Sequence, residues 1–197
     1  MPRFSNSQFN RGFTLVEMLV AMFIFALVIG AIVGLFISGI RGQRNALATQ
    51  RLLDQTSYNL EYMSRALRMA LKEGQQDPLL GDCLLEDGLN YEITNRGSGL
   101  KFINHLEGDD CQEFFLENEQ LKQNKSNLPE PLLLTSNKLK ITQLQFNLIG
   151  QLQPPADNNQ PRLTLSLKIE GRGSAAETMP KIHIQTTISQ RNLDVQQ

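Results

Sequence analysis

Glu17 is the first residue of this chain whose type and position together point to specific chemistry. Its carboxylate adjoins the uncharged segment Met18 to Ile40, in which the 20 residues up to Ile37 carry no polar side chain. At about 1.5 Å per residue, a helix of that length spans roughly 30 Å, the thickness of a bilayer's hydrocarbon core. A carboxylate beside such a segment is costly in lipid, so Glu17 needs a specific partner.

The residues before the apolar run provide a second signal. A short polar leader ends at Gly12, and Phe13-Thr14-Leu15-Val16-Glu17 follows directly. This order of leader, glycine, phenylalanine, glutamate and apolar helix resembles the prepilin signal of type IV pilins and of the pseudopilins of type II secretion. The resemblance covers about residues 11–40. It implies that a membrane enzyme, the prepilin peptidase, cleaves after Gly12 and methylates the new N-terminus at Phe13.

Cleavage after Gly12 would place a charged amine near Glu17. An α-amino group has an unperturbed pKa of about 7.7–8, and a cation inside a helix bundle is costly unless it is paired. Glu17 lies four residues after Phe13, on the same helical face. In a filament of staggered helices, Glu17 of one subunit would meet the Phe13 amine of its neighbour and set the register. Alternatively, Glu17 is an acidic residue favoured by the dipole at a helix N-terminus.

Two other interpretations of the apolar segment remain. An ordinary secretory signal has a core of about 7–15 residues, shorter than this run. Ala46-Leu47-Ala48 has the form of a secretory cleavage site, but Arg41 and Arg44 separate it from the apolar core. The other alternative is a plain signal anchor that carries an extracytoplasmic domain unrelated to filaments.

Arginines lie on both sides of the span, so charge does not fix its orientation. The resemblance implies a single crossing of the cytoplasmic (inner) membrane, with the N-terminus in the cytoplasm and the rest outside it. Gly30 and Gly34 form a G-x-x-x-G pattern that permits close helix contact, although glycine is also common in membrane helices.

The helix is predicted to begin near Phe13 and to continue well beyond Ile40. Apolar positions recur at helical spacings up to Gly74, a favoured helix stop, with Pro78 beyond it. These positions are Ala46, Thr49, Leu53, Leu60, Met63, Leu67 and Ala70. The expected organisation is a leader (1–12), a transmembrane or filament-core helix (13–40), its amphipathic continuation (41–74) and a β-rich head (75–197).

Short alternating patterns in the head predict β-strands. A phase change near Thr142-Gln143 predicts a bulge or a break between two strands. Turns are expected at residues 95–99 and 118–119, and loops at 151–161 and 171–180. The candidate strands are 91–93, 100–103, 112–117, 120–123, 139–148, 163–169 and 182–188. The predicted class is α+β, with a pilin-like antiparallel sheet or two small sheets packed on the amphipathic half of the helix.

Cys83 and Cys111 are the two cysteines of the chain. In an oxidising compartment an even pair predicts one disulfide, and closing this loop would contribute roughly 3.5 kcal/mol. The alternative is two free buried thiols. A zinc site with His105 lacks the usual paired spacing.

The charges disfavour several classes of function. Residues 77–119 carry 11 acidic residues and two basic ones. The head has no basic tract of the kind that indicates nucleic-acid binding. A basic patch that forms only in the folded chain is the alternative. Asp109 and Asp110, with Glu107 and Glu113 nearby, are weak Ca²⁺ candidates, and a solvated acidic face is the alternative. No catalytic or cofactor motif is present, so we expect neither an enzyme nor a bound cofactor.

The resemblance also implies a position within the family. Major pilins commonly carry a disulfide loop near the C-terminus, whereas residues 112–197 contain no cysteine; K-type pseudopilins usually lack a glutamate at the position of Glu17. The chain is therefore most similar to a J-type minor pseudopilin or a related minor pilin, which helps to initiate or cap a filament. Implied partners are the prepilin peptidase, other minor and major subunits, the inner-membrane assembly platform and the lipid bilayer. The alternative is a tip-exposed binding module for adhesion or DNA uptake.

Overall fold

The structure, a computed structural model, describes residues 12–74, 82–151, 159–173, 175 and 179–191. Of the predicted leader, only Gly12 belongs to the described residues. Pro78 and parts of the loops predicted at 151–161 and 171–180 also lie outside them. The chain forms two compact units, Met1–Gln43 and Arg44–Gln197, which are described in turn.

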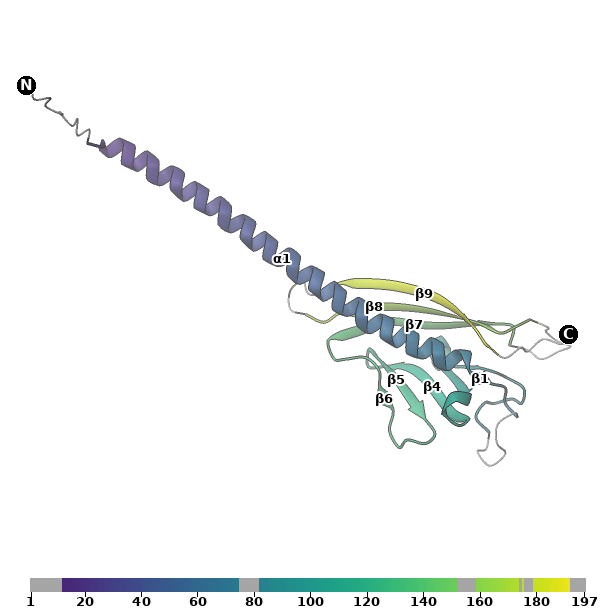
Figure 1. Cartoon of the computed structure of the whole chain (residues 1–197). Helices are drawn as coiled ribbons and strands as arrows, with labels where there is room; N and C mark the ends of the chain where they lie inside the picture. Colours follow the sequence, from purple (N-terminus) through teal and green to yellow (C-terminus); the bar gives the residue numbers. More distant parts are fainter. Residues whose placement is uncertain (1–11, 75–81, 152–158, 174, 176–178, 192–197) are drawn as a thin grey trace, which may run out of the picture. The chain divides into compact units, whose positions relative to one another are not determined.

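Helix α1 runs from Leu15 to Arg68 and is the long helix predicted from the sequence (Figure 1). In the first unit, every side chain from Thr14 to Gly39 is exposed. Among the described helices, α1 is long and apolar enough to cross a membrane, by length and composition. The described part of the chain covers none of this apolar surface.

In the second unit, α1 buries one stripe of its surface. The sequence pattern assigned Leu53 to this stripe, but Leu53 is exposed and Leu52 is buried in its place. The prediction was wrong here because two polar residues, Thr56 and Asn59, complete the stripe. The Thr56 hydroxyl donates to the carbonyl of Leu52 at 2.6 Å, so its burial leaves no unpaired donor. The buried residues of α1 are Leu52, Thr56, Asn59, Met63, Ala66 and Leu67.

The helix ends at Arg68, earlier than the predicted end near Gly74. Donors from distant parts of the chain satisfy its last carbonyl groups: the Tyr91 hydroxyl donates to Leu67 O at 2.6 Å, and Arg191 N donates to Arg68 O at 2.8 Å. Helix termini need such partners, and these come from outside the helix. The local pattern therefore missed the stop.

The first sheet is antiparallel and has six strands among the described residues, in the order β1-β3-β4-β5-β6, with β2 also paired to β3. The predicted turn at Asn118-Glu119 joins β4 to β5, and both turn residues have positive φ, as the tightest hairpin turns require. The 3-10 helices are η2 (Asn95–Gly97) and η3 (His105–Glu107). The strands are β1 (Ala70–Leu71), β2 (Glu92–Thr94), β3 (Gly99–Asn104), β4 (Asp110–Glu117), β5 (Gln120–Lys125) and β6 (Leu132–Leu133).

The second sheet contains β7 (Leu139–Ile149), β8 (Arg162–Gly171) and β9 (Lys181–Ser189), all antiparallel. Its register shifts between Ile141 and Gln143, so the predicted phase change is a bulge inside one strand. The bulge keeps Ile141 and Leu144 on the buried face although the alternation changes phase between them.

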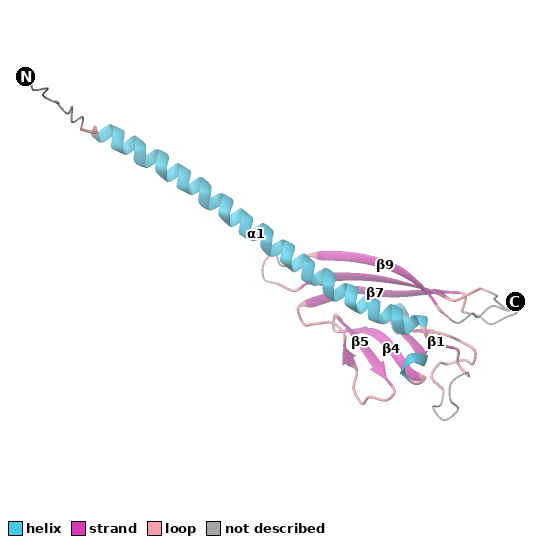
Figure 2. Ribbon diagram, in the orientation of Figure 1, coloured by secondary structure: helices cyan, strands magenta, loops and turns pink. Residues whose placement is uncertain are grey.

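The second half of α1 lies along both sheets (Figure 2), and one hydrophobic core joins these elements. Met63 and Leu67 of the helix are fully buried, as are Phe102 and Phe114 of the first sheet and Leu163 of the second. The rings of Phe102 and Phe114 stack with their centroids 5.4 Å apart. The prediction of an α+β fold with antiparallel sheets is confirmed.

Candidate functional site

The N-terminus of α1 is closed by side chains of Thr14 and Glu17. Glu17 N donates to Thr14 Oγ1 at 3.3 Å, and Thr14 N donates to Glu17 Oε2 at 3.4 Å. This reciprocal pair is a capping box, in which a Thr and a Glu three residues apart satisfy two otherwise unpaired backbone donors. The T-x-x-E spacing is a sequence signal for such a cap, but the predictions for Glu17 did not include it. Glu17 therefore has a local structural role in the uncleaved chain.

Gly12 and Phe13, the predicted cleavage junction, lie just before this cap. Neither residue belongs to α1, and the side chain of Phe13 is 77% exposed. A peptidase needs an extended, accessible backbone at its cleavage site, and Gly12 and Phe13 are both exposed. The residues before Gly12 lie outside the described part of the chain.

Gly30 and Gly34 lie in the middle of the apolar part of α1. A methyl group placed on either glycine would meet no other described atom within 4 Å, apart from the helix's own backbone nearby. The described part of the chain thus gives these glycines no packing partner. The predicted close helix contact would require a second molecule.

The comparison with known families concerns this same N-terminal segment. Residues 8–33 match the sequence model of the family described as "Prokaryotic N-terminal methylation motif". The match supports a type IV pilin-like protein. It implies processing by prepilin peptidase and assembly with other pilins, and it suggests a structural rather than an enzymatic role, with membrane anchoring through α1. No match was found among curated proteins or among solved structures.

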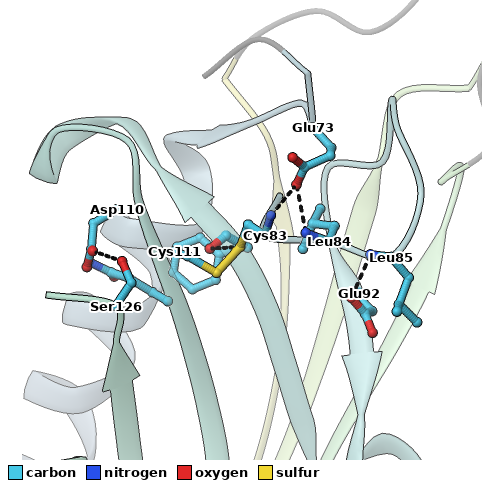
Figure 3. Close-up of a disulfide and its surroundings, with 10 residues drawn as sticks. Glu73, Cys83, Leu84, Leu85, Glu92, Asp110, Cys111 and Ser126 are labelled. Atoms are coloured by element: carbon cyan, nitrogen blue, oxygen red, sulfur yellow. Dashed lines mark hydrogen bonds between the residues drawn. A yellow bond between two sulfur atoms is a disulfide. The ribbon is translucent and has the colours of Figure 1, made fainter. Parts of the chain in front are cut away.

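The second candidate feature of the chain is the disulfide of the head. Cys83 and Cys111 are joined, with their Cα atoms 5.6 Å apart (Figure 3). The buried carboxylate of Glu73 accepts hydrogen bonds from Cys83 N at 3.2 Å and Leu84 N at 2.7 Å. Glu92 accepts one from Leu85 N at 3.2 Å. The disulfide and these two carboxylates together hold residues 83–85 against the first sheet.

Sequence reasoning missed the role of Glu73. It assigned this residue to the amphipathic helix, whereas the helix ends at Arg68 and Glu73 follows β1. A buried carboxylate is tolerated where backbone donors surround it, as they do here. No local pattern identifies such a residue, because its partners lie ten and eleven positions further along the chain.

The acidic candidates for Ca²⁺ are engaged by protein donors, and Gln112 Nε2 donates to both Glu107 and Asp110. Asp109 pairs with His105 at 2.8 Å, whereas Asp110 accepts hydrogen bonds from Ser126 and Gln112. Glu107 pairs with Lys125, and Glu113 accepts a hydrogen bond from Thr94. Within the described ranges, no group of three or more His, Cys, Asp and Glu side chains is placed to hold a metal ion.

Proposed function

We propose that this chain is a minor pilin or pseudopilin, most similar to the J type, that helps to initiate or cap a type IV pilus-like or type II secretion filament. The observation that carries the proposal is the apolar part of α1. The methylation motif matched at residues 8–33 includes most of it, and its side chains are exposed from Leu15 to Gly39. A helix that is hydrophobic on all sides is stable only inside lipid or among other helices. A filament subunit uses both environments in turn.

The disulfide supports an extracytoplasmic head. Disulfides persist in oxidising compartments and are rare in the cytoplasm. The bond between Cys83 and Cys111 therefore fits a head outside the inner membrane and an N-terminus in the cytoplasm. In this proposal the chain crosses the membrane once, between Met18 and Ile40, before it enters a filament.

The minor position is supported by the placement of this bond. The bond joins two residues in the first part of the head, Cys83 and Cys111, and the second sheet contains no cysteine. Major pilins commonly carry their disulfide loop near the C-terminus. The proposed partners are the prepilin peptidase, other minor and major subunits, and the assembly platform of the inner membrane.

The proposed pairing of Glu17 explains how the subunit would join its neighbours. Cleavage after Gly12 removes the leader and frees the Phe13 amine, which needs an anion in a low-dielectric environment. Glu17 lies close to this terminus, and its hydrogen bonds to Thr14 are long, at 3.3–3.5 Å. Its carboxylate can exchange this weak cap for a charge-assisted bond to the amine of the next subunit.

The intact mass and N-terminal residue of the membrane-extracted chain test the proposal. The measurement compares cells with and without a prepilin peptidase. We expect a chain that starts at methylated Phe13 only when the peptidase is present. A chain that starts at Met1 in both strains would instead identify a signal-anchored domain and would overturn the filament proposal.

A further inference from the structure

A basic pocket lies in the second unit, next in sequence to the apolar segment. It has a volume of about 490 Å³ and is formed by helix residues 44–55, the start of β7 and the residues at the end of β8. Four of its lining residues are cationic and none is acidic: Arg44, Arg51, Lys138 and Arg172. Leu47 and Leu139 are among the apolar lining residues. The volume falls in the range of about 300–1,000 Å³ that is usual for small-molecule sites.

Most of the positive charge in this pocket is uncompensated. Among the described residues, no ion pair involves Arg44, Arg51 or Lys138. Arg172 pairs with Glu119 at 2.8 Å, but Glu119 does not line the pocket and also pairs with Lys140 at 2.9 Å. These exposed pairs are weak, so the Arg172 guanidinium can also reach an anion. Like charges gathered without a counter-charge favour an anionic ligand.

The covalent chain places this pocket near the membrane surface. Arg44 follows Ile40, the last residue of the uncharged segment, by four positions. Four residues span about 6 Å as helix and at most about 14 Å when fully extended. The polar headgroup region adds roughly 5–7 Å to each side of the hydrocarbon core. If Met18 to Ile40 crosses the bilayer, Arg44 must lie at or near the level of the lipid phosphates.

From this charge and position, we propose that the pocket binds the headgroup of an anionic phospholipid. Arg44 and Arg51 present guanidinium forks, which match the oxygens of a phosphate in pairs, while Lys138 supplies a point charge. Leu47, which is exposed, offers an apolar surface to the glycerol and the first acyl carbons. The bound lipid fixes the head at the membrane surface until the subunit leaves the bilayer. This inference rests on the proposed function only in requiring that α1 spans a membrane.

A second basic pocket of the same unit provides a matched control. It has a volume of about 640 Å³ and is lined by Arg65, Arg68 and Arg191. Arg65 follows Arg44 by 21 positions of the same helix, about 30 Å along its axis. Removing two arginines from this pocket changes the net charge as much as removing Arg44 and Arg51. The two pairs of arginines differ in their position relative to the apolar segment, and Arg65 also pairs with Glu61 at 2.8 Å.

The test uses the full chain in lipid nanodiscs that contain equal amounts of phosphatidylglycerol and phosphatidylcholine. Native mass spectrometry then counts which lipid stays bound when the nanodisc is removed. Each basic residue near an anionic membrane contributes about fivefold in binding, so Arg44→Gln with Arg51→Gln should reduce retained phosphatidylglycerol by about 25-fold. Arg65→Gln with Arg68→Gln should retain it as the unchanged chain does. Both variants replace exposed side chains, and their melting temperatures check that the fold persists.

The other outcomes refute the lipid site. Equal retention of the two lipids would show that the chain has no preference for an anionic headgroup. Equal loss of phosphatidylglycerol in both double variants would show that the charge acts without a defined pocket. Displacement of the lipid by millimolar inorganic phosphate would identify a site for small free anions. The N-terminal residue of each sample is determined in parallel. Normal processing at Phe13 without lipid preference overturns this inference alone, whereas an unprocessed Met1 start overturns the proposed function.

Discussion

The two parts of α1 share one secondary structure but differ in what covers them. From Leu15 to Gly39 every side chain is exposed, although nearly all are apolar. From Arg44 to Arg68 the helix buries one stripe against the two sheets and exposes its charged residues. Their hydrophobic patterns distinguish the two parts, because the first is apolar on all sides and the second along one stripe. The comparison separates the part that the chain stabilises by itself from the part that needs an external environment.

The largest expected effect concerns the N-terminal end of the exposed part. Glu17→Gln keeps an acceptor that can complete the capping box but removes the negative charge. We expect this variant to insert into the membrane normally and to be lost from filaments, because the Phe13 amine of the neighbour stays unpaired. Glu17→Ala should behave in the same way. The measurement is the amount of the chain in sheared or purified filaments relative to the membrane fraction.

Thr14→Ala distinguishes the charge of Glu17 from its capping role. This variant removes the hydroxyl that accepts from Glu17 N but leaves the carboxylate in place. It should weaken the first helical turn by about 1 kcal/mol and leave incorporation into filaments largely intact. If Thr14→Ala abolished incorporation while Glu17→Gln did not, the carboxylate would act as a cap and the proposed register role would be wrong.

The next largest effect compares how a buried and an exposed leucine of α1 contribute to the free energy of unfolding of the head. Leu67 is fully buried in the head, whereas Leu27 is 59% exposed. Leu67→Ala should lower the free energy of unfolding of the head by about 2–5 kcal/mol, since it removes buried contacts and leaves a cavity. Leu27→Ala should leave it unchanged. Denaturant unfolding of the full chain in mild detergent measures both, and an equal loss in the two variants would contradict the division between the parts.

The sequence predicted best what short-range periodicity controls. The apolar run of α1, the β4–β5 hairpin with its turn at Asn118-Glu119, and the bulge of β7 all follow from residue spacing over a few positions. The end of α1 was missed because its partners, Tyr91 and Arg191, lie far along the chain. The buried stripe was misassigned at Leu52 because polar residues share it.

The candidate sites divide along the same line. Gly12, Phe13 and Glu17 lie in one short segment, so the sequence alone predicts them, and the family match at residues 8–33 includes all three; their roles in processing and register stay predictions. Glu73 and the pocket containing Arg44 and Lys138 depend on segments that only the fold brings together. The net charge of the chain, −1, also concealed this pocket, because the acidic residues of the head cancel its basic ones in the total.

A further effect concerns the disulfide of the head, which joins Cys83 to Cys111. Cys83→Ser with Cys111→Ser removes a bond that closes a loop of 28 positions, which should cost roughly 3.5 kcal/mol through the entropy of the unfolded chain. Reduction of the unchanged protein should produce the same shift in its unfolding midpoint. Membrane insertion of α1 should not change in either case. A lower unfolding midpoint of the head with unchanged membrane insertion would show that the bond stabilises the head alone. An unchanged midpoint would contradict a stabilising role for the bond.

The smallest effect tests how the head terminates the helix. Burial raises the pKa of the Tyr91 hydroxyl above its ordinary value, and this hydroxyl donates to Leu67 O at 2.6 Å. Tyr91→Phe should destabilise the head by about 1–3 kcal/mol, because it leaves a buried carbonyl unpaired. Since the folded chain retains the tyrosine proton where the unfolded chain loses it, the contribution is complete below pH of about 10 and falls as the pH rises further. Unfolding curves between pH 8 and 11 should therefore converge for the two proteins only at the alkaline end. A constant difference across this range would show that the hydroxyl ionises equally easily in the folded and unfolded chains, and its proposed burial against the end of α1 would be wrong.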